Sequence, residues 1–475
     1  MCQFDWSHMY SRRLVRRSWI GVSAVLLAAC LARTSYGQVT VKDLTGTDDV
    51  GPYYQDVEDA IKRYQARDVD GARKLLLEAS KKSTRIAPGE VLLGRILLAT
   101  NQRPTAYAEL ERAMKSHPDD PEPLILLGDV AYSEGRVTEA GMLYTHAVGL
   151  ANKFSQNATR KKDLQARAYG GAALVLEARE QWKEARPMLE AWVKVSPDQV
   201  AAHNRLGRTL FELGDRNGAL TALQNGAKAD PKAVPAEFTL AGLYLTAKEP
   251  DKAESWVKSG ASKNKSFNAQ LAAANLYLQL NNVKQALAHA DQAVKLDPKN
   301  TDANLMRGMI ARLQKDYETS ERYLARAHLM SPTNFQALNQ LSLVLIEQED
   351  EADKKRALEF AEWLARMAVR TPQAAEANAT LGWIQYRTGR NAEAERTLST
   401  LTTFNPETAY FAANVLRDRG RTADALKLLD FALQQDRPFV YRDEAEALRS
   451  KLKAQDTPSK PSGAGETPAI PGTGM

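Results

Sequence analysis

Cysteine is almost absent from this sequence of 475 residues: only Cys2 and Cys30 occur, both within the first 30 positions. The chain after Cys30 therefore has no means of forming an intrachain disulfide or a thiolate metal site, and its stability must come from packing. Histidine is also scarce, with six residues in all, and no two of them after residue 37 have the spacing of zinc ligands. The sequence thus predicts no metal site and no cofactor.

Long apolar runs are also missing, apart from one near the N-terminus. Four arginines precede this run, which spans residues 20–32. Its 13 residues fall short of the about 17–25 that a membrane-crossing helix needs. Ser35 and Gly37 then place small residues where a signal peptidase reads the chain. The pattern predicts a signal peptide over residues 1–37, removed from the mature protein, and no transmembrane span.

A second cleavage site competes with the first. The segment Leu27-Ala28-Ala29-Cys30 resembles the lipobox of bacterial lipoproteins. This resemblance implies a lipoprotein signal over residues 1–29 and a lipid-bearing Cys30 as the first mature residue. Both alternatives place the protein outside the cytoplasm, in the periplasm or outer cell envelope, and the second anchors it through Cys30. Met9 is an alternative start to Met1.

The basic charge of the chain belongs mostly to this leader. Lys and Arg number 64 against 58 Asp and Glu, for a formal charge of +6. Residues 1–37 hold five arginines and one aspartate, so their removal leaves +2, and removal of residues 1–29 leaves +3. The composition of the mature chain therefore does not indicate binding to phosphate backbones, and we expect no nucleic-acid partner.

The rest of the sequence repeats with a regular period of about 34 residues. Leu-Gly pairs end at Gly94, Gly128, Gly207 and Gly382; an alanine follows each glycine at one fixed spacing, at Ala106, Ala140, Ala219 and Ala394; a proline follows three of them at twice that spacing, at Pro118, Pro231 and Pro406. Small residues at two fixed positions allow two helices to approach closely. The proline ends the second helix, because it supplies no amide hydrogen and crowds the preceding turn.

This pattern resembles the tetratricopeptide repeat, in which Leu-Gly, a later Ala and a final Pro recur with the same period. Weaker copies in the same phase fill the gaps between the clear ones. The resemblance implies an all-α fold: a right-handed superhelical solenoid of about eleven antiparallel helix pairs over residues 53–438. Two surpluses interrupt the register, at residues 150–165 and 349–355, and both predict lengthened surface connections between helices.

Three shorter segments complete the organisation. Residues 38–52 form a polar linker. Residues 439–455 fit one amphipathic helix that would cap the last apolar surface of the array. Residues 456–475 contain four prolines, four glycines and no aromatic residue, and this composition predicts a disordered tail.

Catalytic signatures are missing from all of these segments. The sequence has no phosphate-binding Gly-x4-Gly-Lys-Ser/Thr, no Gly-x-Ser-x-Gly and no His-Glu-x2-His motif. Acidic residues fall mostly on outer helix faces and turns, where we interpret them as solvated surface charges. Because no segment is left over for a catalytic domain, we expect that the protein is not an enzyme and has no catalytic residue.

The resemblance implies a protein-protein interaction scaffold, which we place in the bacterial cell envelope as an accessory part of an assembly or secretion machine. It would bind a partner protein or an extended peptide in the concave groove of the solenoid. Two other interpretations stay open: a regulatory subunit of a separate catalytic partner, and a surface carbohydrate binder that uses Trp383 and Tyr386. The sequence does not identify the partner.

In this family the first helix of each repeat lines the concave face. The exposed positions of those helices include twelve candidate binding residues: Asn204, Arg205, Arg208, Asn275, Asn339, Gln340, Trp383, Tyr386, Arg387, Tyr410, Asn414 and Arg417. Asn and Arg can hydrogen-bond the carbonyl groups of an extended peptide, and Trp and Tyr offer rigid contact area. The competing interpretation is that Phe211, Trp383 and Tyr410 pack between neighbouring repeats.

Overall fold

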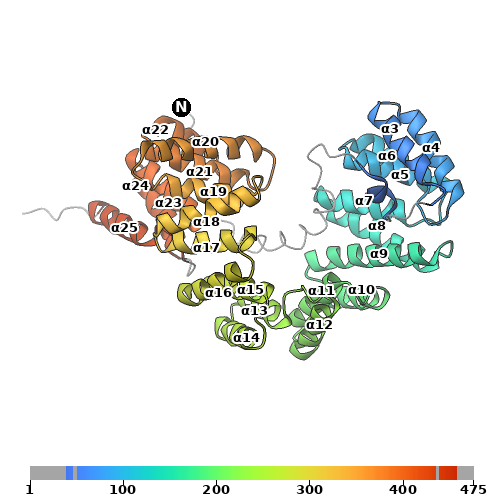
Figure 1. Ribbon diagram of the computed structural model, residues 1–475, viewed down its shortest axis with the longest axis horizontal. Coiled ribbons are helices and arrows are strands. Elements are labelled where there is room, and N and C mark those ends of the chain that lie inside the picture. The colour runs from blue at the N-terminus through green and yellow to red at the C-terminus, as the bar shows by residue number, and fades with distance from the viewer. Residues whose placement is uncertain (1–38, 47–50, 435–437, 457–475) are drawn as a thin grey trace, which may run out of the picture. The chain divides into compact units, whose positions relative to one another are not determined.

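The computed structural model describes residues 39–46, 51–434 and 438–456, and over these residues the chain is all-helical. It contains 24 helices and no strand within those ranges (Figure 1). The predicted signal peptide with Cys30 lies outside the described residues, as do the predicted tail from residue 457 onward and part of the linker. The predicted all-α class is confirmed.

Twenty-two of the helices form eleven consecutive antiparallel pairs, the number that the repeat pattern predicts. The first helices of the pairs are α3 (Tyr54–Gln65), α5 (Gly89–Ala99), α7 (Glu122–Ser133), α9 (Ala158–Ala178), α11 (Val200–Glu212), α13 (Ala236–Thr246), α15 (Phe267–Gln279), α17 (Thr301–Leu313), α19 (Phe335–Leu345), α21 (Ala374–Arg387) and α23 (Pro406–Asp418). The second helices are α4 (Val69–Lys82), α6 (Arg103–Ser116), α8 (Val137–Lys153), α10 (Trp182–Val195), α12 (Arg216–Ala229), α14 (Pro250–Lys263), α16 (Val283–Leu296), α18 (Tyr317–Met330), α20 (Glu351–Met367), α22 (Asn391–Leu398) and α24 (Thr422–Leu433).

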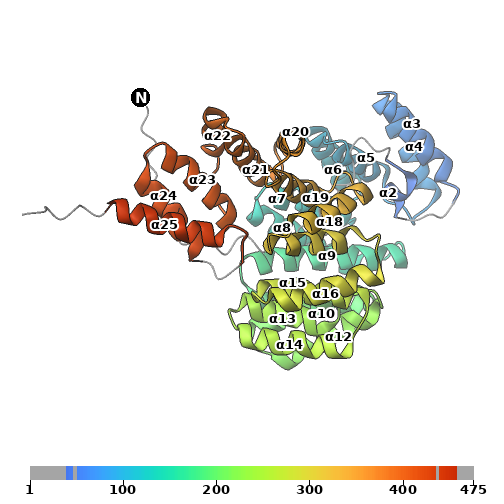
Figure 2. The ribbon, with the colours of Figure 1, turned by 60° about the vertical axis from the view of Figure 1, so that its left-hand side comes forward.

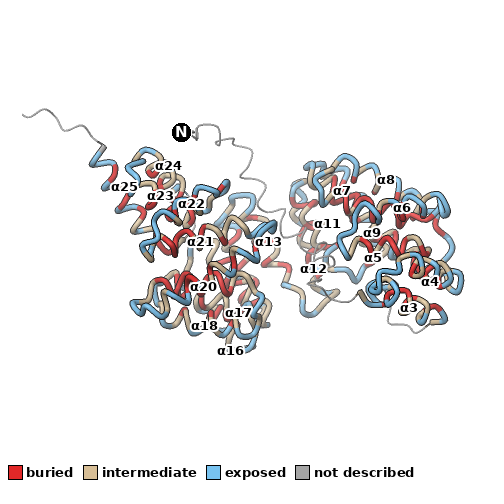
Figure 3. The backbone as a smooth tube through the Cα atoms, turned by 90° about the horizontal axis from the view of Figure 1, so that it is seen from above, coloured by how far each residue is buried: buried red, intermediate tan, exposed pale blue. Residues whose placement is uncertain are grey.

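The pairs belong to two compact units, divided after Ala233. Unit 1 holds the five pairs from α3 to α12, and unit 2 holds the six pairs from α13 to α24. In each unit the buried residues follow the sides on which helices meet, and exposed residues follow the outer sides and the connections (Figure 3). Each unit is therefore held by apolar contacts between successive helices rather than around one central point.

The repeat glycines lie where the two helices of a pair come closest. A Cβ added to Gly207, Gly308 or Gly382 would lie 2.7, 2.6 or 2.5 Å from the Cγ atom of a leucine on the second helix. Real Cβ atoms essentially never come within 3.0 Å of another heavy atom. The glycine of the repeat is therefore required by packing at these positions.

Gly308→Ala is expected to lower the free energy of unfolding of unit 2 by about 1–3 kcal/mol, because the added methyl group overpacks a filled contact. Its neighbour, Leu324, is fully buried and has little room to move. Gly242→Ala is the matched control: it also lies in a first helix of unit 2, and its added Cβ meets no atom within 4 Å. This control should stabilise by about 0.5–1 kcal/mol through helix propensity. Urea unfolding of both variants measures the difference, and equal effects would contradict the close approach.

In every pair except α19–α20, the turn between the two helices uses a left-handed residue, whether or not glycine is present. Gly135, Gly214, Gly389 and Gly420 have φ values of 72–88°. Asn101, Asn281 and Lys315 occupy the corresponding turns with φ values of 57–59°. Asparagine tolerates this conformation well, whereas lysine adopts it at a cost. The repeats without glycine are therefore degenerate in sequence but keep the same turn.

The first sequence surplus lengthens helices rather than a connection, and the second lengthens both α20 and its connection to α19, residues 346–350, so the predicted longer connections are confirmed only in part. The first surplus extends α8 to 17 residues and α9 to 21, and only residues 154–157 connect them. The second extends α20 to 17 residues, starting at Glu351. Extra residues that continue a helix keep their backbone hydrogen bonds within the segment, which a longer loop would have to replace.

One additional helix lies at each end of the described chain. The helix α2 (Val41–Thr45) lies inside the predicted linker and contacts α3 and α5, with Val41 and Leu44 buried (Figure 2). The helix α25 (Arg442–Asp456) packs on α24 and buries Ala445, Leu448 and Leu452. Each end of the array thus has an extra element over its apolar surface.

Candidate functional site

In unit 2 the first helices contact one another in succession, from α13 through α15, α17, α19 and α21 to α23. In unit 1, α7 contacts α9, and side-chain ion pairs join α5 with α7 and α9 with α11. We call the surface formed by the first helices of each unit the first-helix face. All twelve candidate binding residues lie on these helices: three on α11 in unit 1, and nine on α15, α19, α21 and α23 in unit 2. They therefore divide into two groups rather than one site.

Five of the twelve candidates are buried, so their assignment as exposed residues is corrected: Asn339, Gln340, Trp383, Tyr410 and Asn414. Trp383 is only 3% exposed. Phe211 of α11 is buried as well, and so the packing interpretation holds for Phe211, Trp383 and Tyr410. The amide nitrogen of Asn414 donates to the backbone carbonyl of Tyr410 over 2.9 Å, which is a bond within one helix.

An aromatic cluster explains the burial in unit 2. The Trp383 ring stacks on Phe411 at 4.5 Å between centroids and lies 5.7 Å from Tyr410. Tyr441, from the segment before α25, stacks on Tyr410 at 5.1 Å and meets Trp383 edge-on at 5.6 Å. The hydroxyl of Tyr441 donates to Glu347 over 2.7 Å, although the two residues are 94 positions apart in the sequence. Tyr441 thus covers this part of the first-helix face. Sequence spacing within the repeats does not show such a cover.

Ion pairs lie beside the aromatic cluster in unit 2. The buried Arg312 guanidinium of α17 donates to the Glu407 carboxylate of α23 over 2.7 Å and to the Gln340 amide oxygen over 3.1 Å. Arg387 pairs with Glu347 at 2.7 Å. Burial raises the pKa of Tyr441 well above its usual value, so it stays a neutral donor. Arg312, Glu347 and Glu407 were not among the predicted site residues.

Three of the remaining candidates in unit 2 are partly accessible. The guanidinium of Arg417 donates to the Tyr386 hydroxyl over 2.8 Å, and this hydroxyl donates to Asp418 over 2.7 Å. Burial and the Asp418 carboxylate raise the pKa of Tyr386 to about 12. Arg387, about a third exposed, lies over the Trp383 ring at 5.4 Å. Asn275 of α15 is exposed. Of these side chains, Tyr386, Arg387 and Arg417 flank the aromatic cluster instead of exposing it.

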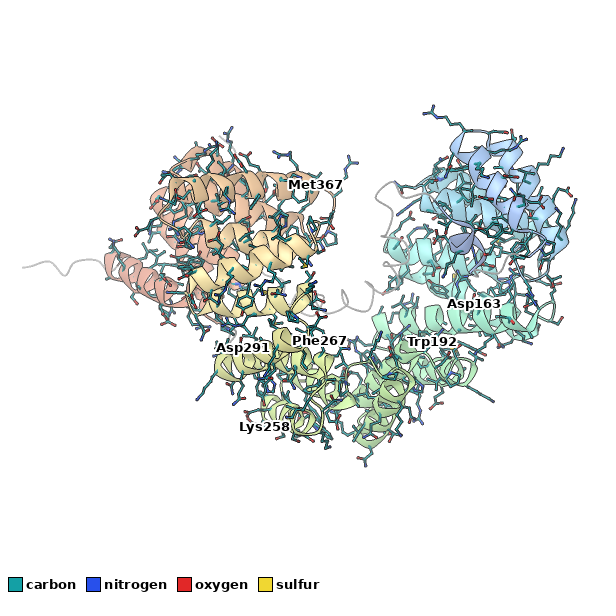
Figure 4. The ribbon with its side chains drawn as sticks, in the orientation of Figure 1. Asp163, Trp192, Lys258, Phe267, Asp291 and Met367 are labelled. Atoms are coloured by element: carbon teal, nitrogen blue, oxygen red, sulfur yellow. The ribbon has the colours of Figure 1, made fainter. Side chains whose placement is uncertain are left out.

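The three candidates in unit 1 lie together on α11. Arg205 donates to the Gly170 carbonyl over 3.0 Å, pairs with Glu177 at 2.8 Å, and lies 5.3 Å from the ring of Trp192, which Figure 4 labels. Arg208 lies 5.5 Å from the Trp182 ring. Among the described residues no carboxylate pairs with Arg208, and Arg208 is partly exposed, as is Asn204. Arg208 thus offers a cation to a partner at low desolvation cost.

A buried carboxylate joins three first helices of unit 1. Glu122 of α7 is 1% exposed and forms ion pairs with Arg95 of α5 and with Arg160 and Arg167 of α9, the last two at 2.8 Å each. Arg160 also pairs with the buried Asp120 at 2.7 Å. Burial alone would raise the pKa of Glu122, but the three arginines outweigh it and hold the pKa far below its usual range.

Glu122 has an equivalent in unit 2. It lies six residues before the repeat glycine Gly128, and Glu376 lies six residues before Gly382. Sequence reasoning missed both carboxylates, although this position of the repeat counts among those of the first-helix face. Both could have been identified from the sequence, because each is a carboxylate at a repeat position that faces the neighbouring first helices.

Neither a metal site nor a membrane-crossing helix is found among the described residues. Among them, no group of three His, Cys, Asp or Glu side chains could hold a metal ion. Within the same part of the chain, no helix is long and apolar enough to cross a membrane.

Two solved structures align with this chain at low similarity. A tetratricopeptide repeat protein from Parabacteroides merdae aligns over 54% of this chain and 98% of its own, with 13% identity and a TM-score of 0.42. A chain of the "APC/C hetero-tetramer Cut9-Hcn1" aligns over 92% of this chain and 96% of its own, with 14% identity and a TM-score of 0.41.

Comparison of sequences identifies the repeats. Models of the tetratricopeptide repeat match residues 91–153 and 271–337, and residues 176–235 and 210–274. The "TPR repeat-containing protein PA4667" of Pseudomonas aeruginosa is 27% identical over 202 residues, which is 42% of this chain and 33% of that protein. The "BBSome complex member BBS4" of Bos taurus is 21% identical over 166 residues, 35% of this chain and 32% of that protein. The chain thus spans about a third of the length of these curated relatives. These matches show that the chain contains tetratricopeptide repeats.

Proposed function

We propose that this protein is a non-enzymatic interaction scaffold of the bacterial cell envelope, which binds a partner protein or an extended peptide on its first-helix face. Tetratricopeptide-repeat proteins are generally interaction scaffolds. The observation that carries the assignment to this face is Arg208, a partly exposed cation held over Trp182 at 5.5 Å with no carboxylate partner among the described residues.

The structure removes the reason for a carbohydrate site at Trp383 and Tyr386. A sugar-binding aromatic ring must expose one face, and the Trp383 ring is buried against Phe411 and Tyr441. The remaining alternative is that the protein is a regulatory subunit of a separate catalytic partner. Identification of the captured protein would distinguish it from the proposed function.

The envelope location is supported by the leader sequence alone. With signal cleavage after Gly37 the protein would be soluble in the periplasm, and with a lipid at Cys30 it would stay with membranes. We expect Cys30→Ser to move the protein from the membrane fraction to the soluble fraction if the lipobox is used. Finding the intact chain in the cytosol with its first residues retained would contradict export.

Arg208→Ala should reduce capture of the partner from the envelope of the native organism by about tenfold or more, since arginines that a partner buries at the centre of an interface often dominate affinity. Crosslinking followed by mass spectrometry of the mature full-length protein measures capture. Lys183→Ala is the matched control, because Lys183 is an exposed cation on the second helix α10. Helical content should be unchanged in both variants, and equal capture by both would exclude Arg208 from the site.

A further inference from the structure

The carboxylate of Glu376 on α21 is held only by neutral donors. The amide nitrogen of Gln336 lies 3.2 Å from Oε1 and 3.1 Å from Oε2, and the amide nitrogen of Asn339 lies 3.1 Å from Oε1. Both donors come from α19, the preceding first helix. Among the described residues no lysine, arginine or histidine forms an ion pair with Glu376. A carboxylate has about four acceptor sites, so this one keeps capacity for another donor.

The surroundings of Glu376 would favour the binding of a cation that this chain does not itself supply among its described residues. Burial raises the pKa of this carboxyl above its usual value, and the nearby charge of Glu407 adds to the rise. Arg312, a buried cation of this face, is already paired with Glu407. Glu376 itself is only partly buried, so a ligand can reach it.

A second, independent observation points to the same place. Asn339 is 1% exposed, and its amide nitrogen is turned toward Glu376. Its amide oxygen, Oδ1, is buried and has no hydrogen-bond partner. If the Asn339 amide were flipped, its oxygen would face the Glu376 carboxylate and the two would repel each other. Electrostatics therefore fixes the orientation of this amide. Buried polar atoms are almost always hydrogen-bonded, so an acceptor without a partner beside a carboxylate that lacks a cation calls for a further donor group.

Unit 1 shows what such a group does at the equivalent position. Glu122 occupies the same place in its repeat, and arginines from both neighbouring first helices neutralise it: Arg95 from α5, and Arg160 and Arg167 from α9. In unit 2 the residue at the repeat position of Arg167 is Tyr410 on α23, and the preceding first helix α19 places the neutral Gln336 against Glu376. The repeat therefore accommodates a guanidinium group here, and unit 2 does not supply one from its own described residues.

We propose that Glu376, Asn339 and Gln336 form a subsite for an arginine side chain of the bound partner. The inference rests on the proposed peptide-binding function and names the chemistry that this face recognises. A guanidinium group presents several coplanar N–H donors, which can bond a carboxylate and an adjacent amide oxygen together. The partner segment is thus basic at this point.

Two pools of immobilised nonapeptides test the subsite with the full-length protein. The pools share mixed flanking residues and differ only at the central residue, which is arginine in one and its neutral isostere citrulline in the other. We expect capture of the arginine pool to exceed that of the citrulline pool by about tenfold or more, the range for losing one partner of a desolvated charge pair. Glu376→Gln should abolish the preference, and Glu351→Gln should keep it, since Glu351 is an exposed carboxylate on the second helix α20.

Gln336→Arg is the second variant, and it keeps Glu376 in place. It should also abolish the preference, because an internal arginine would occupy the carboxylate as the arginines of unit 1 occupy Glu122. Circular dichroism and melting confirm that each variant is folded. Equal capture of both pools, or a preference that survives both Glu376→Gln and Gln336→Arg, would overturn the subsite and leave the proposed function standing. Capture of neither pool would overturn the proposed function together with the subsite.

Discussion

Glu122→Gln should lower the free energy of unfolding of unit 1 by about 3–5 kcal/mol, the usual cost of removing one partner from a buried ion pair. Glutamine has nearly the same shape, so packing is preserved and only the charge is lost. Arg160 would then keep its pair with the buried Asp120, and Arg167 would keep Asp129 at 3.8 Å. The effect should be large because Glu122 joins α5, α7 and α9 rather than one pair of helices.

Hydrogen exchange in urea, read separately for the peptides of α5 to α9, measures this loss. A readout for each unit is needed because repeat arrays do not always unfold in one step. Glu139→Gln provides the control: Glu139 pairs with Arg136 on the surface of unit 1 and is half exposed. Its loss should cost under about 1 kcal/mol. Equal costs for the two variants would show that the Glu122 network adds nothing beyond a surface pair.

The repeat itself could be predicted because its signals are local. Gly308 and Leu324 lie on the two successive helices of one pair, and their contact is a steric requirement that every copy must satisfy. Because this requirement recurs along the sequence, the number of pairs and the all-α class could be predicted from its copies. The two surpluses were only partly predicted, because counting residues between prolines does not tell whether the extra ones continue a helix.

The candidate site could be located on the correct helices but not on the correct side chains. Arg312 and Glu407 are 95 residues apart, and Tyr441 comes from beyond the last pair, yet all three lie against the same first-helix face. Which positions stay accessible depends on these distant contacts. Pairing of charges is equally non-local, since Glu122 and Glu376 share one repeat position but differ in what the neighbouring helices present to them.

Trp383→Ala is expected to lower the free energy of unfolding of unit 2 by about 3–5 kcal/mol, the typical cost of removing a large buried aromatic side chain. The ring contacts Tyr386, Tyr410, Phe411 and Tyr441, with centroids 4.5–5.7 Å away. Its loss would leave a cavity between α21, α23 and the segment before α25. Trp363→Ala is the matched control, because Trp363 is 37% exposed on α20 of the same unit, and it should cost under about 1 kcal/mol.

Trp383→Phe separates packing from polar chemistry. The indole nitrogen of Trp383 is buried without a hydrogen-bond partner, and phenylalanine removes that donor while keeping a ring against Phe411. Since an unpaired buried donor is itself destabilising by about 1–3 kcal/mol, Trp383→Phe should cost much less than Trp383→Ala in urea unfolding. A ring that instead contacted a bound partner would show the reverse pattern: little loss of stability in Trp383→Ala, and a large loss of partner capture in a folded protein.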